Sequence, residues 1–551
     1  MGGSRPAVVI AAVLLGAFVF IYRFNALGGS FGGFDNDHFI QLALAKQVEA
    51  GAQPLRDFSD AVQGARPSLT YELSAAAQRW LGDNFLSEAL LTVSGVALAA
   101  VVTFVTGARL APWPWALTIT VLSVLLSPKL YSYPKVLVLA VASLLIVVYA
   151  ERPSRSRAAG LGVWTAIAFL FRHDYAVYCA AGVVAVLAAA HRHDPRTALR
   201  RVAGSGLLAL VLLLPSIWWV QRYAGLGEYV RNALEISARE ADRTSLHGWP
   251  AFSLSGVESV TGFFSRAENT RAWLYYTLLA LPWAGVAAIG VKWLRRTPDP
   301  RGWTAAVAGL SVLAGVCAKF FLRGNLPARF SEVAPAAAVL ALALLGSWTY
   351  RGTSRAAPWL VRNAVAVLLV LITATSLMVL LRVPAEFRST YLNSPARAIT
   401  QTGDLFRELR TLPGAMREAG PVSRMQAADY VHRCTKPADR VLVFSYAPEI
   451  EVFAERLFAG GRAAFMPGYY AREKYSRDAL AWLARESVPI IIAEPDETSE
   501  LYERFPLLAD YFRSNYDDAG SVMMSEVAFR VFVRRASVPT GTSGEGLPCF
   551  G

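Results

Sequence analysis

Long apolar stretches alternate with short polar loops along the chain as far as about residue 381. A helix that crosses a bilayer needs about 20 mainly apolar residues. The apolar stretches predict about eleven spans, near 6–24, 85–106, 112–128, 134–150, 158–171, 175–191, 203–223, 271–292, 302–322, 333–350 and 361–381. The pattern therefore predicts an α-helical polytopic membrane protein.

Arginine-rich loops give the predicted orientation. The segments "ERPSRSR", "HRHDPRTALRR", "KWLRRTPDPR" and "YRGTSRAAPWLVR" all fall on one side if the predicted spans alternate. By the positive-inside rule that side is cytoplasmic. The first long loop (25–84), the loop 224–270 and the C-terminal region are then expected on the outer side.

Two amphipathic segments lie within the first long loop. Residues 37–50 place Ile40, Leu44 and Val48 on one helical face, and residues 68–81 do the same with Leu69, Leu73 and Trp80. Helices of this kind can lie flat at the membrane interface, or they can pack on one another as an outer cap. The pattern does not choose between the two.

From about residue 385 the charge rises and the long apolar runs stop. Strands are predicted at 440–445, 489–494 and 527–535, and helices between them at 476–487 and 499–512. This alternation predicts a small α/β layer domain. We therefore expect a transmembrane domain over 1–384 and an extracytoplasmic α/β domain over 385–551, the last dozen residues forming a flexible tail.

Composition agrees with a membrane protein. The chain is 54% hydrophobic and only 17% charged, whereas a soluble protein carries about 25% charge. The net charge of +13 comes mainly from arginines in the short loops, which is typical of topological signals and not of nucleic-acid binding. Cys179 and Cys317 lie in apolar runs, whereas Cys434 and Cys549 could pair if the C-terminal region is extracytoplasmic. No Cys/His spacing typical of a metal site is present.

Candidate acids follow the first predicted span. The stretch "GGFDNDHF" carries Asp35, Asp37 and His38, and "PLRDFSDAVQGARPSL" carries Asp57. A carboxylate beside a membrane-embedded site can act as a general base if partial burial raises its pKa. Alternatively, Asp35 caps a helix and Asp37 lies in its first turn. Both interpretations can hold together, and for Asp57 a capped turn is the simpler one.

Candidate anion ligands lie in three further outer segments, "SPKLYSYPK", "FLFRHDYAVY" and "FFLRGNLPARFSE". Positive charge is disfavoured on the outer side, so it calls for a reason. An anionic ligand is one reason; snorkelling to lipid headgroups or a self-paired polar turn is the other. The candidate substrate-binding residues here are Lys129, Tyr133, Lys135, Arg172, His173, Arg323 and Arg329. Together with the acids, they could bring an anionic lipid headgroup against a base.

These motifs resemble those of the GT-C membrane glycosyltransferases, and most of all the protein O-mannosyltransferases and the lipid A aminoarabinose transferases. "FDNDHF" is similar to the "FDExHF" of the mannosyltransferases: Phe34, Asp35, His38 and Phe39 match, while Asn36 replaces the second acid. "PLRDFSDAVQGARPSL" resembles their second acidic loop motif. "DRVLVFSYAPEIEVFAERLFA" is similar to the first strand and helix of the outer domain in bacterial relatives.

The resemblance implies transfer of a sugar from a polyprenyl-phosphate carrier to an acceptor hydroxyl of a glycan, lipid or protein, outside the membrane and with inversion. It implies that Asp35 or Asp37 is the base, that Asp57 assists, and that His38 and the outer cations bind substrate. No metal or other cofactor is expected to be required, although some relatives use a metal. The absence of Asn-x-Ser/Thr sites and the abundance of Ala and Arg favour a bacterial plasma membrane.

A lipid or sugar transporter is the alternative function, because it too would have many spans. A transporter is expected to carry ionisable groups near span centres and often inverted repeats. Here the predicted spans are nearly free of charge and the polar groups gather at one face. A non-catalytic scaffold would not need the acids of the first loop. We therefore expect a transferase with an accessory outer domain.

Overall fold

The computed structural model describes residues 5–28, 34–59, 68–126, 128–245, 249–257, 259–296, 299, 302–322, 326–349, 356–414, 425–467, 469–524 and 526–551. The chain divides into two compact units. The first unit comprises Met1–Gly28, Thr92–Pro215 and Glu240–Thr402, and the second comprises Gly29–Leu91, Ser216–Arg239 and Gly403–Gly551. The sequence predicted a boundary between two domains after residue 384, and this boundary stays a prediction.

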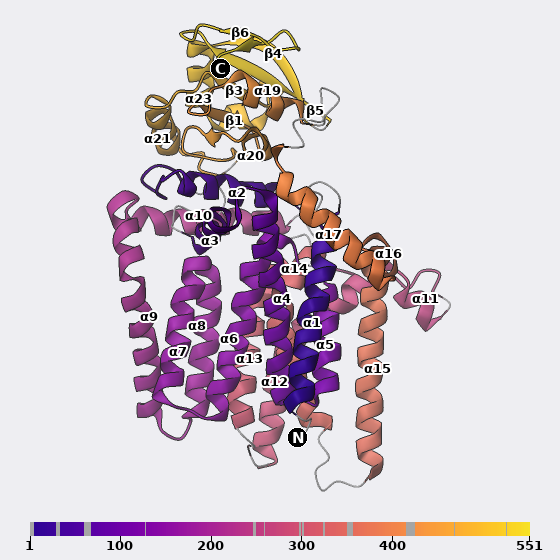
Figure 1. Ribbon diagram of the computed structural model, residues 1–551. Helices are drawn as coiled ribbons and strands as arrows, with labels where there is room; N and C mark the ends of the chain where they lie inside the picture. Colours follow the sequence, from indigo (N-terminus) through magenta and orange to yellow (C-terminus); the bar gives the residue numbers. More distant parts are fainter. Residues whose placement is uncertain are drawn as a thin grey trace. The chain divides into compact units, whose positions relative to one another are not determined.

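Helices make up most of the first unit and run side by side (Figure 1). Four helices belong partly to the first unit and partly to the second: α4, α9, α10 and α17. The helices of the first unit are α1 (Arg5–Asn25), α4 (Phe85–Leu110), α5 (Trp113–Leu125), η1 (Leu130–Ser132), α6 (Tyr133–Glu151), α7 (Arg155–Phe171), α8 (His173–Ala190), α9 (Pro195–Tyr223), α10 (Leu226–Ser245), α11 (Val260–Phe264), α12 (Ala267–Leu294), α13 (Trp303–Cys317), η3 (Ala318–Leu322), α14 (Leu326–Thr349), α15 (Ala356–Leu380), α16 (Val383–Ser389) and α17 (Pro395–Thr411).

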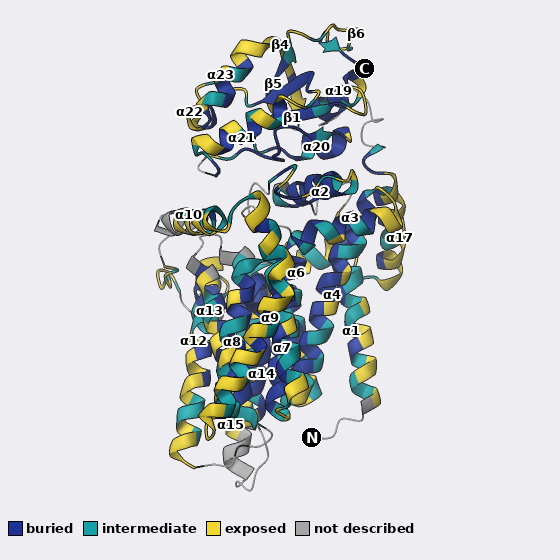
Figure 2. Ribbon diagram, turned by 90° about the vertical axis from the view of Figure 1, so that its left-hand side faces the viewer, coloured by how far each residue is buried: buried dark blue, intermediate teal, exposed yellow. Residues whose placement is uncertain are grey.

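A helix is present at each of the predicted spans. In the described part of the chain, eight helical segments are long and apolar enough to cross a membrane, and α5 and α13 are shorter apolar helices. The chain is therefore a multi-pass membrane protein, as predicted. Burial differs among these helices: α6 and α14 are mostly buried, whereas α9, α12 and α15 turn much of their apolar surface outward (Figure 2).

Helix α14 is central to the first unit, where it packs against α5, α6, α12, α13 and α15. Near its end, Gly346 lies so close to the end of α4 that an added Cβ would collide with the backbone carbonyl of Leu110. Only glycine allows that approach, because the colliding atom belongs to the backbone and cannot rotate away. This contact fixes the end of α14 against α4.

The second unit combines helices of the first long loop with the C-terminal region. Its further elements are α2 (Asn36–Glu49), α3 (Leu69–Leu81), α19 (Gln426–Cys434), β1 (Arg440–Phe444), α20 (Glu449–Ala454), β2 (Leu457–Phe458), α21 (Glu473–Leu483), β3 (Ile490–Ala493), α22 (Glu500–Arg504), α23 (Pro506–Asn515), β4 (Tyr516–Met524), β5 (Val527–Arg534), β6 (Gly541–Thr542) and β7 (Pro548–Cys549).

The main sheet of the second unit has the strand order β2-β1-β3-β5-β4. Strands β1, β2 and β3 pair in parallel, and β5 is antiparallel to β3 and β4. Side chains from one sheet face, such as Leu442 and Ile491, form a core with α21, α22 and α23. The predicted α/β layer is thus present, with β2 and β4 in addition. The helix predicted over 499–512 is two helices, because Pro506 starts the second of them.

Helix α2 is buried on nearly all sides, where it contacts α3, α20 and β2. Helix α3 keeps Leu73, Trp80 and Leu81 exposed. The sequence left open whether the two amphipathic helices pack on one another or lie at the membrane interface. For α2, the structure shows packing. Of these two helices, α3 is the one that keeps an exposed apolar face suited to a membrane interface.

Two segments differ from expectation. The loop 224–270 contains α10 and α11, and the second unit holds α10 through Glu228, which accepts a hydrogen bond of 2.7 Å from the Tyr475 hydroxyl. The last dozen residues, predicted to be flexible, form the β6–β7 hairpin and bury Phe550. A disulfide joins Cys434 to Cys549, the pairing that the sequence left open. This covalent tie explains why a Gly-rich tail is ordered.

We expect Gly346→Ala to destabilise the first unit by about 1–3 kcal/mol, the usual cost of overpacking a well-packed site. Gly290→Ala is the control, because a Cβ at that helical position of α12 meets nothing within 4 Å. The control is expected to be neutral or slightly stabilising. Thermal unfolding of the purified protein measures both, and equal melting temperatures for Gly346→Ala and the wild type would contradict this packing.

Candidate functional site

The acidic loop motif begins helix α2. Asp35 is the N-cap residue, and its carboxylate accepts a hydrogen bond of 3.2 Å from the backbone N–H of His38. Asp37 lies in the first turn, where the helix dipole favours a negative charge. The capping interpretation is therefore confirmed for Asp35, and it leaves a catalytic role open.

Asp37 has a partner from the C-terminal part of the chain. The Tyr446 hydroxyl donates a hydrogen bond to its Oδ1. Burial raises the pKa of Tyr446 above its ordinary value, and the negative charges of Asp37, Asp35 and Glu449 raise it further. The tyrosine therefore stays protonated at neutral pH and remains a donor to the carboxylate.

Glu449 completes this group of acids. Burial raises the pKa of its carboxyl to about 7. Its Oε2 is buried and has no hydrogen-bond partner among the described residues. Next to it on α20, burial and the charge of Glu449 raise the pKa of Glu451 well above its ordinary value. We name Asp35, Asp37, Tyr446 and Glu449 the acidic group.

Aromatic packing holds the acidic group in place. Phe39 of α2 and Phe85 of α4 both pack on Phe453 of α20, at ring-centroid distances of 5.6 and 5.2 Å. His38 is buried, and its Nε2 lies 2.8 Å from Oε1 of Glu88 on α4. The start of α2 is therefore packed against α4 and α20. Substrate binding by His38 stays a prediction.

Asp57 lies in a turn of the second unit. It accepts a hydrogen bond of 2.8 Å from the backbone N–H of Gln53 and bonds of 2.6–3.0 Å from the Arg56 guanidinium. Burial alone would raise the pKa of Asp57, but the bonds from Arg56 and Gln53 outweigh it and lower the pKa. These contacts fit the capped-turn interpretation, and a role in the reaction stays a prediction.

Several predicted cations come together in the first unit around Glu332 of α14. This carboxylate is 2% exposed. It pairs with Lys135 of α6 and accepts bonds of 3.0 and 3.1 Å from Arg329, one helical turn before it. Lys129 and Lys135 both lie over the Tyr131 ring, at 5.6 and 5.3 Å from its centroid.

Arg172 belongs to the same group. Its Nε donates a hydrogen bond of 2.8 Å to Asp174, and its charge acts on Lys135, Arg329 and Glu332. We name Lys129, Lys135, Arg172 and Arg329, with Glu332 and Asp174, the cation cluster. Its four cations face two carboxylates, so positive charge is in excess among these residues. The Nε of Arg329 is buried and has no partner in the described part of the chain.

Two other predicted residues, Tyr133 and His173, lie at the starts of helices. Tyr133 starts α6, and a Cβ on Gly95 of α4 would collide with its ring, so glycine is needed there. His173 starts α8 beside Arg172. Arg323 lies outside the described residues, as do Asp60 and Arg66 of the second acidic loop.

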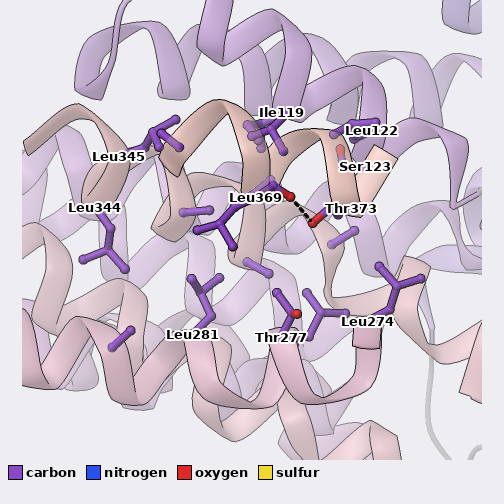
Figure 3. A pocket seen from close by; sticks show the side chains of 18 of the residues that line it. Ile119, Leu122, Ser123, Leu274, Thr277, Leu281, Leu344, Leu345, Leu369 and Thr373 are labelled. Carbon is purple, nitrogen blue, oxygen red and sulfur yellow. Dashed lines mark hydrogen bonds between the residues drawn. The ribbon is translucent and has the colours of Figure 1, made fainter. Parts of the chain in front are cut away.

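An apolar groove of about 560 Å³ lies among α5, α12, α14 and α15 (Figure 3). Leucines from all four helices line it, with Leu122, Leu281, Leu345 and Leu369 among them. On α14 the lining runs from Ala334 to Trp348. Fourteen residues of helix span roughly 20 Å. The groove therefore begins two residues from Glu332 and follows α14 for most of a bilayer's hydrocarbon thickness.

Within the described ranges, no three or more His, Cys, Asp or Glu residues are grouped in a way that could hold a metal ion. Whether the reaction needs a metal stays a prediction.

Sequence reasoning missed Glu332, Tyr446 and Glu449 of these groups, and also Glu88, the partner of His38. Glu332 was part of a quoted motif, and its position three residues after Arg329 was the available signal. Glu88 lies inside an apolar run, where a charge by default indicates pairing or function. Tyr446 and Glu449 had no signal, because their partners are distant in the sequence.

The fold matches solved structures, while no protein-family model and no curated protein matches the sequence. The structure is similar to ArnT from Cupriavidus metallidurans bound to undecaprenyl phosphate, with a TM-score of 0.50 and 12% identity over 97% of this chain and 99% of that one. An oligosaccharyltransferase from Archaeoglobus fulgidus in the apo form matches with a TM-score of 0.40 and 13% identity, over 98% of this chain and 76% of that one. The match to ArnT confirms the predicted GT-C-like fold class.

We expect the stability of the second unit to depend on pH through Glu449. Its folded-state pKa of about 7 lies above the ordinary 4.5, so its contribution is fully present below pH 4.5 and is lost as pH rises through 7. Glu449→Gln stays neutral, and should therefore stabilise the protein by under about 1 kcal/mol at pH 5 and by about 3 kcal/mol at pH 8.

Unfolding of the purified protein between pH 5 and pH 8 measures this difference. Glu500→Gln, at an exposed position of α22 in the same unit, is the control. A stability gain that is the same at both pH values would show that Glu449 is not held neutral by burial.

Proposed function

We propose that the protein transfers a sugar from a polyprenyl-phosphate carrier to an acceptor hydroxyl. The main support is that one helix, α14, contributes to both the cation cluster and the apolar groove. Arg329 and Glu332 belong to the cluster, and Ala334 and later residues line the groove. A polyprenyl phosphate has the matching structure, an anionic head on a long apolar chain. The similarity to ArnT, solved bound to undecaprenyl phosphate, supports this carrier class.

The groove suits the isoprenoid chain. Its lining is almost entirely Ala, Leu, Ile, Val and Trp, with few hydroxyls. One of those, on Thr373, donates within its own helix to the carbonyl of Leu369 at 2.9 Å (Figure 3). A lining with so few polar groups favours a hydrocarbon and offers little to a sugar.

The cation cluster suits the phosphate. Its excess of positive charge would stabilise the phosphate as a leaving group, and Arg329 has an Nε–H to offer. Charge-assisted hydrogen bonds of this kind are about twice as strong as neutral ones. The cluster therefore favours departure of the lipid phosphate without a general acid.

We assign the proton transfer to Asp35. The acceptor hydroxyl gives its proton to the carboxylate, its oxygen attacks the anomeric carbon, and the bond from that carbon to the phosphate oxygen breaks with inversion. The electron pair of the broken bond leaves on the polyprenyl phosphate. Asp37 and Asp57 would orient the acceptor or stabilise positive charge on the sugar. The transferred sugar is a hexose or a pentose.

We further propose that this reaction takes place on the outer face of a bacterial plasma membrane. The support is the arginine-rich composition of the loops assigned to the cytoplasm. The C-terminal α/β domain and the acidic loop are then extracytoplasmic, an environment in which the disulfide between Cys434 and Cys549 persists.

We expect Val370→Trp to fill the groove and to weaken the binding of undecaprenyl phosphate about tenfold or more. Leu371→Trp is the matched control, because Leu371 neighbours Val370 on α15 but points outward and does not line the groove. Native mass spectrometry of the purified protein titrated with undecaprenyl phosphate measures both affinities. Equal affinities for the two variants would place the carrier elsewhere.

We expect Asp35→Asn to lower turnover roughly 10²–10⁴-fold, because the amide cannot accept the acceptor's proton. The amide oxygen still caps α2, so stability should change by well under about 1 kcal/mol. The assay follows release of polyprenyl phosphate from a lipid extract of cells that lack the protein.

Asp37→Asn is the comparison for this test. If it abolishes turnover while Asp35→Asn does not, Asp37 is the base. If neither variant changes turnover, the acidic loop is not a catalytic site.

A further inference from the structure

One side chain of the C-terminal α/β domain, Tyr446, forms a hydrogen bond with the acidic loop. Tyr446 lies two residues after β1, and its hydroxyl donates to Asp37, a residue 409 positions earlier in the chain. The resemblance that suggested the acids of the loop assigned no task to this domain, which we expected to be accessory. The hydrogen bond calls that expectation into question.

Packing on both sides fixes the position of the hydroxyl. Strand β1 lies inside the sheet between β2 and β3, and four of its five residues are buried. After Tyr446 the chain stays anchored, because Ala447 and Ile450 are buried in the domain. Phe453, at the other end of this short segment, packs on Phe39 of α2. The donor and the acceptor are therefore both carried by rigid elements of the same unit.

The charges around the bond explain why a donor is needed. Asp35 at the start of α2 and Glu449 of α20 both lie close enough to act on Tyr446, as Asp37 does. On α4, Glu88 is occupied with His38. Negative neighbours disfavour the ionised form of a carboxylate, whereas a hydrogen bond to the carboxylate favours it. A phenol at this place opposes the repulsion among the acids.

We infer that Tyr446 is a positioning residue for Asp37: its hydroxyl holds the carboxylate in a fixed direction, so that the C-terminal domain is part of the catalytic centre. This inference rests on the function proposed above, in which Asp37 orients the acceptor or stabilises positive charge on the sugar. The domain then does more than pack, because a catalytic carboxylate depends on its β1–α20 connection. Tyr446 itself need not touch the substrate.

Tyr446→Phe tests the inference, since it keeps the ring and removes only the hydroxyl. Turnover of the lipid extract and affinity for undecaprenyl phosphate are both measured. Without the donor, Asp37 is no longer held in place, so turnover should fall about tenfold, the usual effect of losing a hydrogen bond to a charged group. Affinity for undecaprenyl phosphate should not change. Turnover at the wild-type rate would overturn the inference.

Tyr516→Phe is the matched control. This buried tyrosine of the same unit donates its hydroxyl to the carbonyl of Val488 at 2.9 Å. Its loss should lower stability to a similar extent and leave turnover unchanged. If Tyr516→Phe lowers turnover as far as Tyr446→Phe does, the loss reflects general loosening of the domain, and the inference is wrong.

A further variant covers the case in which Tyr446→Phe fails to fold. A 3-fluorotyrosine at 446 keeps the shape and strengthens the donor, so turnover should not fall, and a clear loss of turnover in the folded protein contradicts the inference. Where Tyr446→Phe does fold, it should reduce turnover less than about twofold in an Asp37→Asn background, because the two residues act as a unit. If the wild type releases no polyprenyl phosphate at all, it is the proposed function that fails.

Discussion

An ionised side chain within a helical bundle is strongly unfavourable unless an opposite charge lies beside it. The first unit depends on this constraint at Glu332, which is 2% exposed and is compensated by Lys135 and Arg329. The pairing ties α6 to α14 and sets where the polar part of α14 ends. Beyond it α14 is apolar, and the groove follows. Carrier binding, as we propose it, needs both parts of this helix.

In the second unit, the comparable interaction is a hydrogen bond from a neutral hydroxyl to one of several neighbouring carboxyl groups. Asp35, Asp37 and Glu449 gather around the Tyr446 hydroxyl. Burial of a carboxyl group in this cluster is unfavourable for its ionised form, and it raises the pKa of Glu449 to about 7. Strained electrostatics of this kind is more often found at functional sites than in structural cores. This is why we assign the proton transfer to this unit.

Local patterns predicted the elements well. Apolar runs of span length located the membrane helices, and period-3.6 faces located α2 and α3, because both signals lie within one helix. Strand β4 was missed because "YDDAGSVMM" shows no apolar alternation. The ordered tail was missed because its order comes from a disulfide between cysteines that lie 115 positions apart in the sequence. Candidate residues of both the acidic group and the cation cluster were found from their charge alone. Their partners were not: Lys135 lies 197 positions from Glu332, and no property of a single segment shows such a pair.

The central claim is that the protein breaks the bond between a sugar and a lipid phosphate. Purified protein in sealed vesicles, supplied with a lipid extract from cells that lack it, tests the claim by mass spectrometry of the vesicle lipids. The account predicts that a polyprenyl-phosphate sugar disappears while an equal amount of polyprenyl phosphate appears. A lipid-linked sugar that keeps its mass and only changes leaflet would contradict the account and identify a transporter.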